Sequence, residues 1–229
     1  MSLLTNLRAL WHMNNNWQCS AGGYHGTAYG ATFGTPKLGA ASGSFDGVDD
    51  YVAIPPFDVG NIHTLAFWGL CRDASYLKDS QAMGKEARFS VYFTTGLPIK
   101  FISGNGAGWS GGWKSANTII TANTFHLGII VVNGSTENVS FYLNGAPNGS
   151  VFCPNIALNT TFWLGGREGA SAGYRLNGLL DEVAFWNRAL TAEEALELYN
   201  GGAGIELGGG AAVSGRRRRM MAMREAMYV

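Results

Sequence analysis

The sequence predicts an all-β protein, a two-sheet antiparallel sandwich with one short helix near its C-terminus. About thirteen short segments rich in aromatic and β-branched residues follow one another at the spacing of sandwich strands. Glycine accounts for 33 of the 229 residues and only 14% of residues are charged, a composition that suits many strands joined by tight turns. Within the sandwich only one segment has helical periodicity, and in the tail Met220, Met223 and Met227 fall at helical spacing. A chain of this length can form a single all-β domain.

The first half of the chain contains strand patterns in regular order. Residues 7–13, LRALWHM, form the first, and the glycine-interrupted residues 25–34 form the next. Residues 44–55 hold two short strands on either side of the turn Asp46-Gly47-Val48-Asp49. Residues 64–71, TLAFWGLC, have little polar character, so we expect a central strand that is buried on both faces.

The second half of the chain contains five strand patterns. Residues 88–94 and 97–103 form one expected pair, residues 125–133 and 139–144 form another, and residues 161–165 stand alone. Thr95-Gly96 separates the first two patterns and predicts a tight hairpin. Asn144-Gly145 is the strongest hairpin signal in the chain, because both residues tolerate the positive φ of such turns.

Residues 176–199 change from strand to helical periodicity. The first half of this segment is apolar and aromatic and predicts a strand. Thr191 followed by Glu194 predicts a capping box, in which each side chain accepts a hydrogen bond from the other residue's backbone N–H. Gly201-Gly202 predicts the helix end, where a left-handed residue is favoured. One strand should therefore lead directly into one short helix.

Two long motifs are similar to the signatures of a known family. Residues 178–199, GLLDEVAFWNRALTAEEALELY, resemble the C-terminal signature of LamG-like domains of the concanavalin A-like lectin/glucanase superfamily (laminin G–pentraxin type). Residues 36–55, PKLGAASGSFDGVDDYVAIP, resemble the early motif of the same domains. The resemblance implies a concanavalin A-like jelly roll that occupies residues 1–202.

The motifs of the common enzyme classes are missing from the sequence. A retaining glycosidase needs two carboxylates roughly 5 Å apart, and E-[IL]-D-x-x-E, the signature of the catalytic relatives, is absent. Asp181 and Glu182 are adjacent, so on a regular strand they would point to opposite faces. The four histidines have no metal-binding spacing, and neither G-x-S-x-G nor a phosphate-binding loop occurs. We therefore predict a non-enzymatic protein.

Calcium is the cofactor that the resemblance implies. Concanavalin A-like domains often bind Ca²⁺ through carboxylates and backbone carbonyls. In this sequence the resemblance would bring Asp181 towards Asp46 and Asp49, or its neighbour Asp50. The alternative is that Asp46 and Asp49 cap a turn while Asp181 accepts hydrogen bonds from backbone N–H groups.

Two loops contain candidate ligand-binding residues. Trp109 and Trp113 lie in the glycine-rich segment NGAGWSGGW, where exposed rings would be able to stack on sugar faces. The alternative is that both indoles fold back over the sandwich core. The last long loop and the residues after it supply polar partners for a glycan or protein ligand: Arg167, Glu168, Tyr174 and Arg175.

The residues after Gly202 differ in composition from the sandwich. Residues 203–215 are glycine-rich and predict a flexible linker. Residues 216–229 form a basic, methionine-rich segment, which we interpret as an anchor to a larger assembly. Two alternatives are that its basic run contacts nucleic acid or that it is a solvated tail. We consider nucleic-acid binding the weaker hypothesis. The predicted anchor residues are Arg216, Arg217, Arg218, Arg219, Met220, Met223 and Met227.

The cysteines and the absence of targeting patterns indicate where the protein is located. Cys19, Cys71 and Cys153 have no C-x-x-C spacing, and we expect unpaired, buried thiols. The N-terminal residues lack the pattern of a signal peptide, and no apolar run has the length of a membrane span. These observations favour a virion surface or a cytoplasmic location.

The sequence therefore predicts a surface display or adhesion module. Rim loops of the sandwich would contact a glycan or protein ligand, and the C-terminal tail would attach the module to a multi-subunit assembly, such as a decoration or tail component of a phage virion. Such a module would also be able to form a homo-oligomer. The alternative is a freestanding calcium-dependent lectin.

Overall fold

A computed structural model describes residues 2–72, 81–85, 89–93, 96–103, 113–153, 160–166 and 174–208. The first eight strands are β1 (Leu7–Trp11), β2 (Cys19–Ala21), β3 (Thr27–Tyr29), β4 (Thr32–Gly34), β5 (Ser42–Asp46), β6 (Tyr51–Phe57), β7 (Ile62–Cys71) and β8 (Gln81–Lys85). The others are β9 (Phe89–Tyr92), β10 (Pro98–Ser103), β11 (Trp113–Ile119), β12 (His126–Asn133), β13 (Asn138–Leu143), β14 (Ala146–Phe152), β15 (Thr160–Leu164) and β16 (Asn177–Trp186). The helical elements are α1 (Ala192–Tyr199) and the 3-10 turn η2 (Asn200–Gly202).

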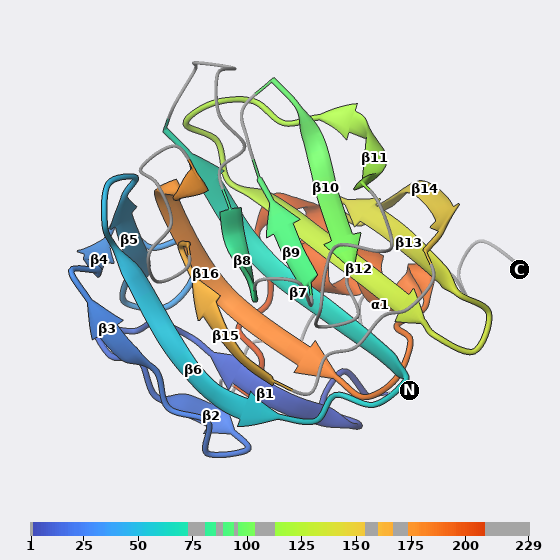
Figure 1. Cartoon of the computed structure of the whole chain (residues 1–229), viewed down its shortest axis with the longest axis horizontal. Helices are drawn as coiled ribbons and strands as arrows, with labels where there is room; N and C mark the ends of the chain where they lie inside the picture. The colour runs from blue at the N-terminus through green and yellow to red at the C-terminus, as the bar shows by residue number, and fades with distance from the viewer. Residues whose placement is uncertain are drawn as a thin grey trace, which may run out of the picture.

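The strands form two antiparallel sheets that pack face to face, as Figure 1 shows. Among the described residues, one sheet has nine strands, seven of them in the order β14-β13-β12-β7-β16-β1-β2, with β5 also paired to β16 and β4 to β5. The other sheet has seven strands in the order β11-β10-β9-β8-β15-β6-β3. This architecture confirms the predicted jelly-roll sandwich with one short helix.

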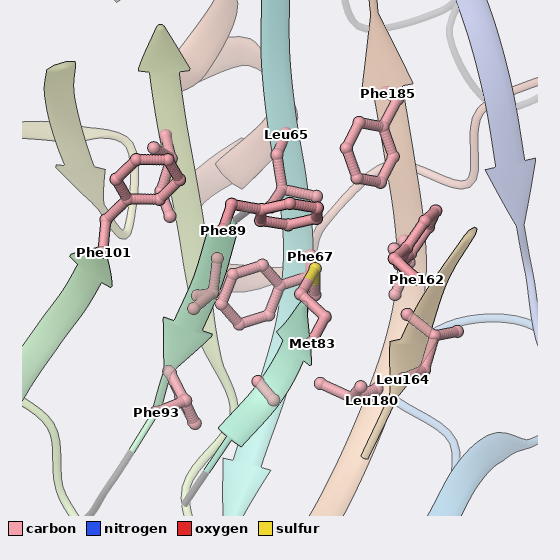
Figure 2. Close-up of a cluster of buried hydrophobic side chains, with 14 of the residues drawn as sticks. Leu65, Phe67, Met83, Phe89, Phe93, Phe101, Phe162, Leu164, Leu180 and Phe185 are labelled. Carbon is pink, nitrogen blue, oxygen red and sulfur yellow. The ribbon is translucent and has the colours of Figure 1, made fainter. Parts of the chain in front are cut away.

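The main hydrophobic core lies between the two sheets. Figure 2 shows Phe67 and Phe185, from the nine-stranded sheet, facing Phe89 and Phe162, from the seven-stranded sheet. The rings of Phe162 and Phe185 are 5.4 Å apart, a separation typical of packed aromatic pairs. Burial of these large side chains supplies the main driving force that holds the sheets together.

The centre of the nine-stranded sheet is buried on both faces. In β7, Leu65 and Phe67 point into the main core, whereas Ala66 and Trp68 belong to a second cluster on the outer face. Leu198 of α1 also belongs to this second cluster, so the helix covers the outer face of the sheet. This two-sided cover explains why residues 64–71 have so little polar character, and it confirms the prediction of a central strand.

The helix begins as predicted and ends one residue earlier. The Thr191 hydroxyl accepts from the Glu194 N–H at 3.3 Å, while Glu194 Oε2 accepts from the Thr191 N–H at 3.0 Å. Asn200 takes the left-handed conformation at φ 48°, and Gly201 follows at φ 63°. Asparagine is the non-glycine residue that tolerates this region best. Within the described part of the chain, no helix has the length and apolar character that a membrane span needs.

Residues 203–208 pack on the outer face of the nine-stranded sheet. Leu207 is only 4% exposed and belongs to the second hydrophobic cluster. The N–H of Gly204 donates to the carbonyl of Tyr199, and Glu206 Oε1 accepts from the side chain of Asn14. The folded unit thus extends beyond the boundary expected at residue 202.

The three cysteines are buried thiols that form no disulfide, as predicted. Cys71 and Cys153 are fully buried, and Cys19 is 6% exposed. Stability therefore rests on packing and hydrogen bonding, without a disulfide among these residues.

Candidate functional site

A tight acidic turn connects β5 and β6 at one end of the sandwich. Asp46 Oδ1 accepts hydrogen bonds from the N–H groups of Val48 (2.7 Å) and Asp49 (3.3 Å), and Gly47 has the positive φ of 79° that the turn requires. Asp50 Oδ2 accepts from the N–H of Asp46 at 2.8 Å. One carboxylate oxygen from each of the three aspartates consequently lies within 4.8 Å of the others.

The carboxyl group of Asp50 is the least exposed of the three. Its burial raises its pKa above the usual range, and the negative charges of Asp46 and Asp49 raise the pKa further. The hydrogen bond from the Asp46 N–H and the charge of Arg175 act in the opposite direction. Because like charges crowd together here, a bound cation would relieve their repulsion.

Arg175 supports this turn from inside the protein. Its Nη1 donates to the carbonyl oxygens of Asp49 (2.9 Å) and Asp50 (3.4 Å), and its guanidinium lies 5.6 Å from the ring centre of Tyr51. The side chain is only 7% exposed. The sequence predicted Arg175 as a ligand-binding residue; the structure places it beneath the rim, where it orients the turn and Tyr51.

Two tyrosines stack face to face beside the acidic turn. Tyr29 on β3 lies directly opposite Tyr51 on β6, and their rings stack with centres 4.6 Å apart and planes 11° apart. Tyr29 is 49% exposed. Exposed aromatic rings offer apolar faces on which sugar rings and apolar side chains can pack. We call Tyr29 and Tyr51 the tyrosine platform; sequence reasoning missed it, since only the pairing of β3 with β6 brings the two rings together.

Most of the other predicted ligand-binding residues fall outside the described part of the chain. Tyr174 is described and is 53% exposed, immediately before the buried Arg175. Trp113 begins β11, and its side chain is not among those described. Trp109, Arg167, Glu168 and the complete predicted anchor, residues 216–229, lie outside the described residues.

Asp181 does not join the acidic turn. Asp46 pairs with Asn177, four residues before Asp181 on β16, a separation of roughly 13 Å along the strand. Asp181 Oδ2 instead accepts hydrogen bonds from the N–H groups of Lys37 and Leu38, at 2.9 and 3.0 Å, and from the hydroxyl of Ser42. Burial raises the pKa of Asp181 to about 6, although these hydrogen bonds oppose the rise. Asp50, and not Asp181, completes the carboxylate group of the turn.

Asp181 and Glu182 lie on the same face of the sheet, and the prediction that they point to opposite faces is wrong. The pairing of β16 with β7 shifts register between Asp181 and Ala184, and Glu182 adopts a positive φ of 47°. This is a β-bulge, in which one extra residue breaks the alternation of side chains. Leu180 and Val183 point into the main core, while the contacts of both carboxylates lie on the outer face.

The Glu182 carboxylate belongs to a second cluster of polar side chains on that outer face. Glu182 Oε1 lies 2.5 Å from His12 Nδ1, and its Oε2 accepts from the Leu207 N–H at 3.4 Å. The hydrogen bond to Glu182 raises the pKa of His12, partly opposed by burial. Burial raises the pKa of Glu182, which His12 in turn lowers. Glu206 brings a second carboxylate within 4.8 Å of this pair.

Comparison with known proteins identifies the family. Residues 46–195 match the model of the concanavalin A-like lectin/glucanases superfamily, a match that runs from the acidic turn into α1 and covers more than half of the chain. The chain belongs to this superfamily. Among curated proteins, none matches the chain.

Several solved structures share this concanavalin A-like fold. Domain 4 of AbnA, a GH43 extracellular arabinanase from Geobacillus stearothermophilus solved in complex with arabinotriose, is 18% identical with a TM-score of 0.67, covering 84% of this chain and 97% of that one. The binding domain of Paraclostridial Mosquitocidal Protein 1 is 14% identical (TM-score 0.70; 87% and 53% covered). The botulinum neurotoxin DC binding domain, solved with rat synaptotagmin II, is 12% identical (TM-score 0.66; 87% and 52% covered). The chain spans about half of each toxin binding domain.

Proposed function

We propose that this protein is a non-enzymatic binding module that presents the tyrosine platform to a glycan. The observation that carries the proposal is the half-exposed Tyr29 ring, stacked on Tyr51 beside three carboxylates. The stack holds the exposed Tyr29 ring in place so that a sugar can pack on it, and neighbouring carboxylates accept hydrogen bonds from sugar hydroxyl groups. A protein ligand that docks an apolar side chain on the same rings is the second candidate.

Similar structures support both candidates. The similar arabinanase domain was solved with arabinotriose, and a similar toxin binding domain was solved with synaptotagmin. These ligands belong to those proteins. At 18% and 12% identity, the similarity to this chain shows a shared fold and no more. For this chain they define the classes of ligand to test first.

Glycan binding is tested by titrating arabinotriose and a panel of other oligosaccharides into the full chain by calorimetry. Tyr29→Ala should weaken binding of the preferred glycan at least tenfold, because it removes the exposed half of the platform. The matched control is Phe152→Ala, which removes an aromatic side chain that is 59% exposed, against 49% for Tyr29, from β14 at an edge of the other sheet. If no glycan binds, or if both variants bind like the parent chain, the proposed glycan site is wrong.

In the proposed module, Asp181 and Glu182 do not act as a catalytic pair. Although Asp181 and Glu182 share a face, Asp181 accepts hydrogen bonds from two backbone N–H groups, and Glu182 is paired with His12. These contacts leave the carboxylates poorly disposed to reach a glycosidic bond. Incubation with the bound glycan should therefore release no shorter sugar. Turnover that Asp181→Asn or Glu182→Gln abolishes would overturn this assignment.

We further propose that the acidic turn binds calcium. Asp46, Asp49 and Asp50 supply three of the six to eight oxygen ligands that Ca²⁺ requires, and water and backbone carbonyls are suitable for the others. A bound ion would stiffen the turn next to the tyrosine platform. Ca²⁺ should raise the melting temperature of the parent chain and leave that of Asp49→Asn unchanged. Asp58→Asn, which alters an aspartate in another turn, is the control and should respond like the parent.

We also propose that the C-terminal residues 209–229 attach the module to a multi-subunit assembly, as in a decoration or tail component of a phage virion. The basic run and the methionines of residues 216–229 support this proposal. The alternative is a freestanding calcium-dependent lectin, in which the tail has no role. Residues 203–208 pack on the sandwich, so a test should leave them in place.

Light scattering on the full chain and on a chain ending at residue 208 separates these alternatives. A trimer or larger particle that becomes monomeric on truncation, with unchanged thermal stability, supports the anchor. Monomers in both cases would favour the freestanding lectin.

A further inference from the structure

Three segments that are far apart in the sequence meet on the outer face of the nine-stranded sheet. His12 follows β1, Glu182 lies in the bulge of β16, and Glu206 lies in the C-terminal segment after η2. One ligand atom of each residue lies within 4.8 Å of the other two. We call these three residues the outer cluster; it is separate from the tyrosine platform and from the acidic turn.

The bulge of β16 places Glu182 in this cluster. Without the extra residue, the alternation of the strand would turn the carboxylate into the hydrophobic core. Glu182 is 5% exposed, and its Oε1 lies 2.5 Å from His12 Nδ1. Asn14 holds Glu206 in place through a 3.1 Å hydrogen bond from its Nδ2 to Oε1. Neighbouring groups thus fix the orientation of both carboxylates, as the outer contacts of metal ligands do.

A cavity of about 250 Å³ lies beside the outer cluster. His12 and Ser20 contribute polar atoms to its wall, and Leu7, Leu10 and Leu207 contribute apolar ones. This space is large enough for water. Because His12 lines this cavity, water can approach the outer cluster from the side of the histidine.

The donor set selects the type of ion. One imidazole nitrogen with two carboxylate oxygens suits Zn²⁺ and similar divalent transition-metal ions, which accept nitrogen and oxygen ligands in four-coordinate sites. Calcium prefers six to eight oxygen ligands and has little affinity for imidazole. The charge also suits a dication, because two carboxylates here face a single histidine.

We propose that His12, Glu182 and Glu206 form a binding site for one divalent transition-metal ion such as Zn²⁺. The ion takes the place of the proton that His12 and Glu182 share, and that proton is released to solvent. Because the ligands come from the residue after β1, from β16 and from the C-terminal segment, the bound ion ties residues 203–208 to the sandwich. It thereby holds Leu207 against the outer face of the sheet.

The experiment is a calorimetric titration of the full, untagged chain with Zn²⁺ in a non-chelating buffer. We expect one equivalent to bind with release of protons, and Co²⁺ to give the visible absorption of a low-coordinate nitrogen and oxygen site. Glu206→Gln and His12→Gln should each weaken binding at least tenfold. Glu206→Gln keeps the shape of a half-buried side chain, so this variant should remain folded. The control is His25→Gln, which removes an exposed histidine outside the cluster.

Hydrogen exchange supplies a second readout. Zn²⁺ should slow exchange of the Leu207 amide, which donates to Glu182, and should have no such effect in Glu206→Gln. Absence of stoichiometric binding would overturn the proposal. Binding that His25→Gln weakens as much as His12→Gln would also overturn it, because it would indicate nonspecific binding at histidines. Neither result bears on glycan binding at the tyrosine platform.

Discussion

At the scale of single residues, His63 is the clearest case of a polar side chain that the fold holds in its neutral form. The imidazole is 2% exposed and its Nδ1 donates to the carbonyl of Gly60 at 2.8 Å, while Nε2 is buried without a partner among the described residues. Burial lowers the pKa of His63 to about 4, although Gly60 and Asp58 oppose the shift. Folding therefore excludes a proton that the unfolded chain takes up below its ordinary pKa of 6.5.

The sign of the resulting pH dependence follows directly. Between about pH 6.5 and pH 4 the unfolded state binds the proton and the folded state does not, so stability falls as the pH falls through this window. From pH 7 to pH 5, His63 should lower the free energy of unfolding by about 2 kcal/mol. Urea denaturation at both pH values should show a smaller fall in the free energy of unfolding for His63→Gln than for the parent chain. The exposed His25→Gln variant should keep the full loss, and an equal effect of both variants would contradict the prediction.

Gly165 shows how closely the core surrounds one backbone position. Its φ is 78°, and a β-carbon there would lie 1.9 Å from the ring of Phe45. Gly165→Ala should therefore lower the free energy of unfolding by about 3 kcal/mol or more, because both strain and overpacking act. Gly23 has a similar φ of 73° with no neighbouring atom within 4 Å. Gly23→Ala should lower the free energy of unfolding by about 1 kcal/mol, from backbone strain alone. Similar losses in the two variants, measured by urea denaturation, would rule out the steric explanation.

At the scale of elements, the capping box determines where α1 begins. Thr191→Ala removes the acceptor for the Glu194 N–H and should lower the free energy of unfolding by about 1 kcal/mol. Thr191→Ser keeps a hydroxyl acceptor and should stay within a few tenths of a kcal/mol of the parent chain. Thermal or urea denaturation measures both variants. A serine variant as unstable as the alanine variant would indicate that packing of the threonine methyl group, and not the hydrogen bond, is responsible.

Elements with strong local signals were predicted well. Asn144-Gly145 does connect β13 to β14, with φ of 52° and 78°, because this dipeptide favours that turn in any context. β11 and β14 were not predicted as strands. β14 includes Pro147 and Gly149, which local propensity disfavours in strands; pairing with β13 overrides that preference.

At the scale of the whole molecule, the sandwich is stable without covalent links between its sheets. Cys19, Cys71 and Cys153 form no disulfide and are buried in the core between the sheets. A thiol reagent should therefore label the native protein slowly and should label three thiols after unfolding. Addition of a reductant should leave the melting temperature unchanged. Rapid labelling of the native chain would show that the sheets separate more readily than their packing indicates.

The sequence by itself determined the fold class, the central buried strand, the cap of α1 and the family resemblance, because each is written in local periodicity or in contiguous motifs. The tertiary structure decided which distant residues meet. In the folded protein Tyr29 stacks on Tyr51, and Arg175 lies beneath the acidic turn. Asp181 lies away from that turn and accepts hydrogen bonds from backbone N–H groups. A bulge of one residue moved Glu182 to the outer face, beside His12 and Glu206. Register and bulges depend on pairing between strands that are far apart in the chain, and side-chain spacing within one strand does not contain that information.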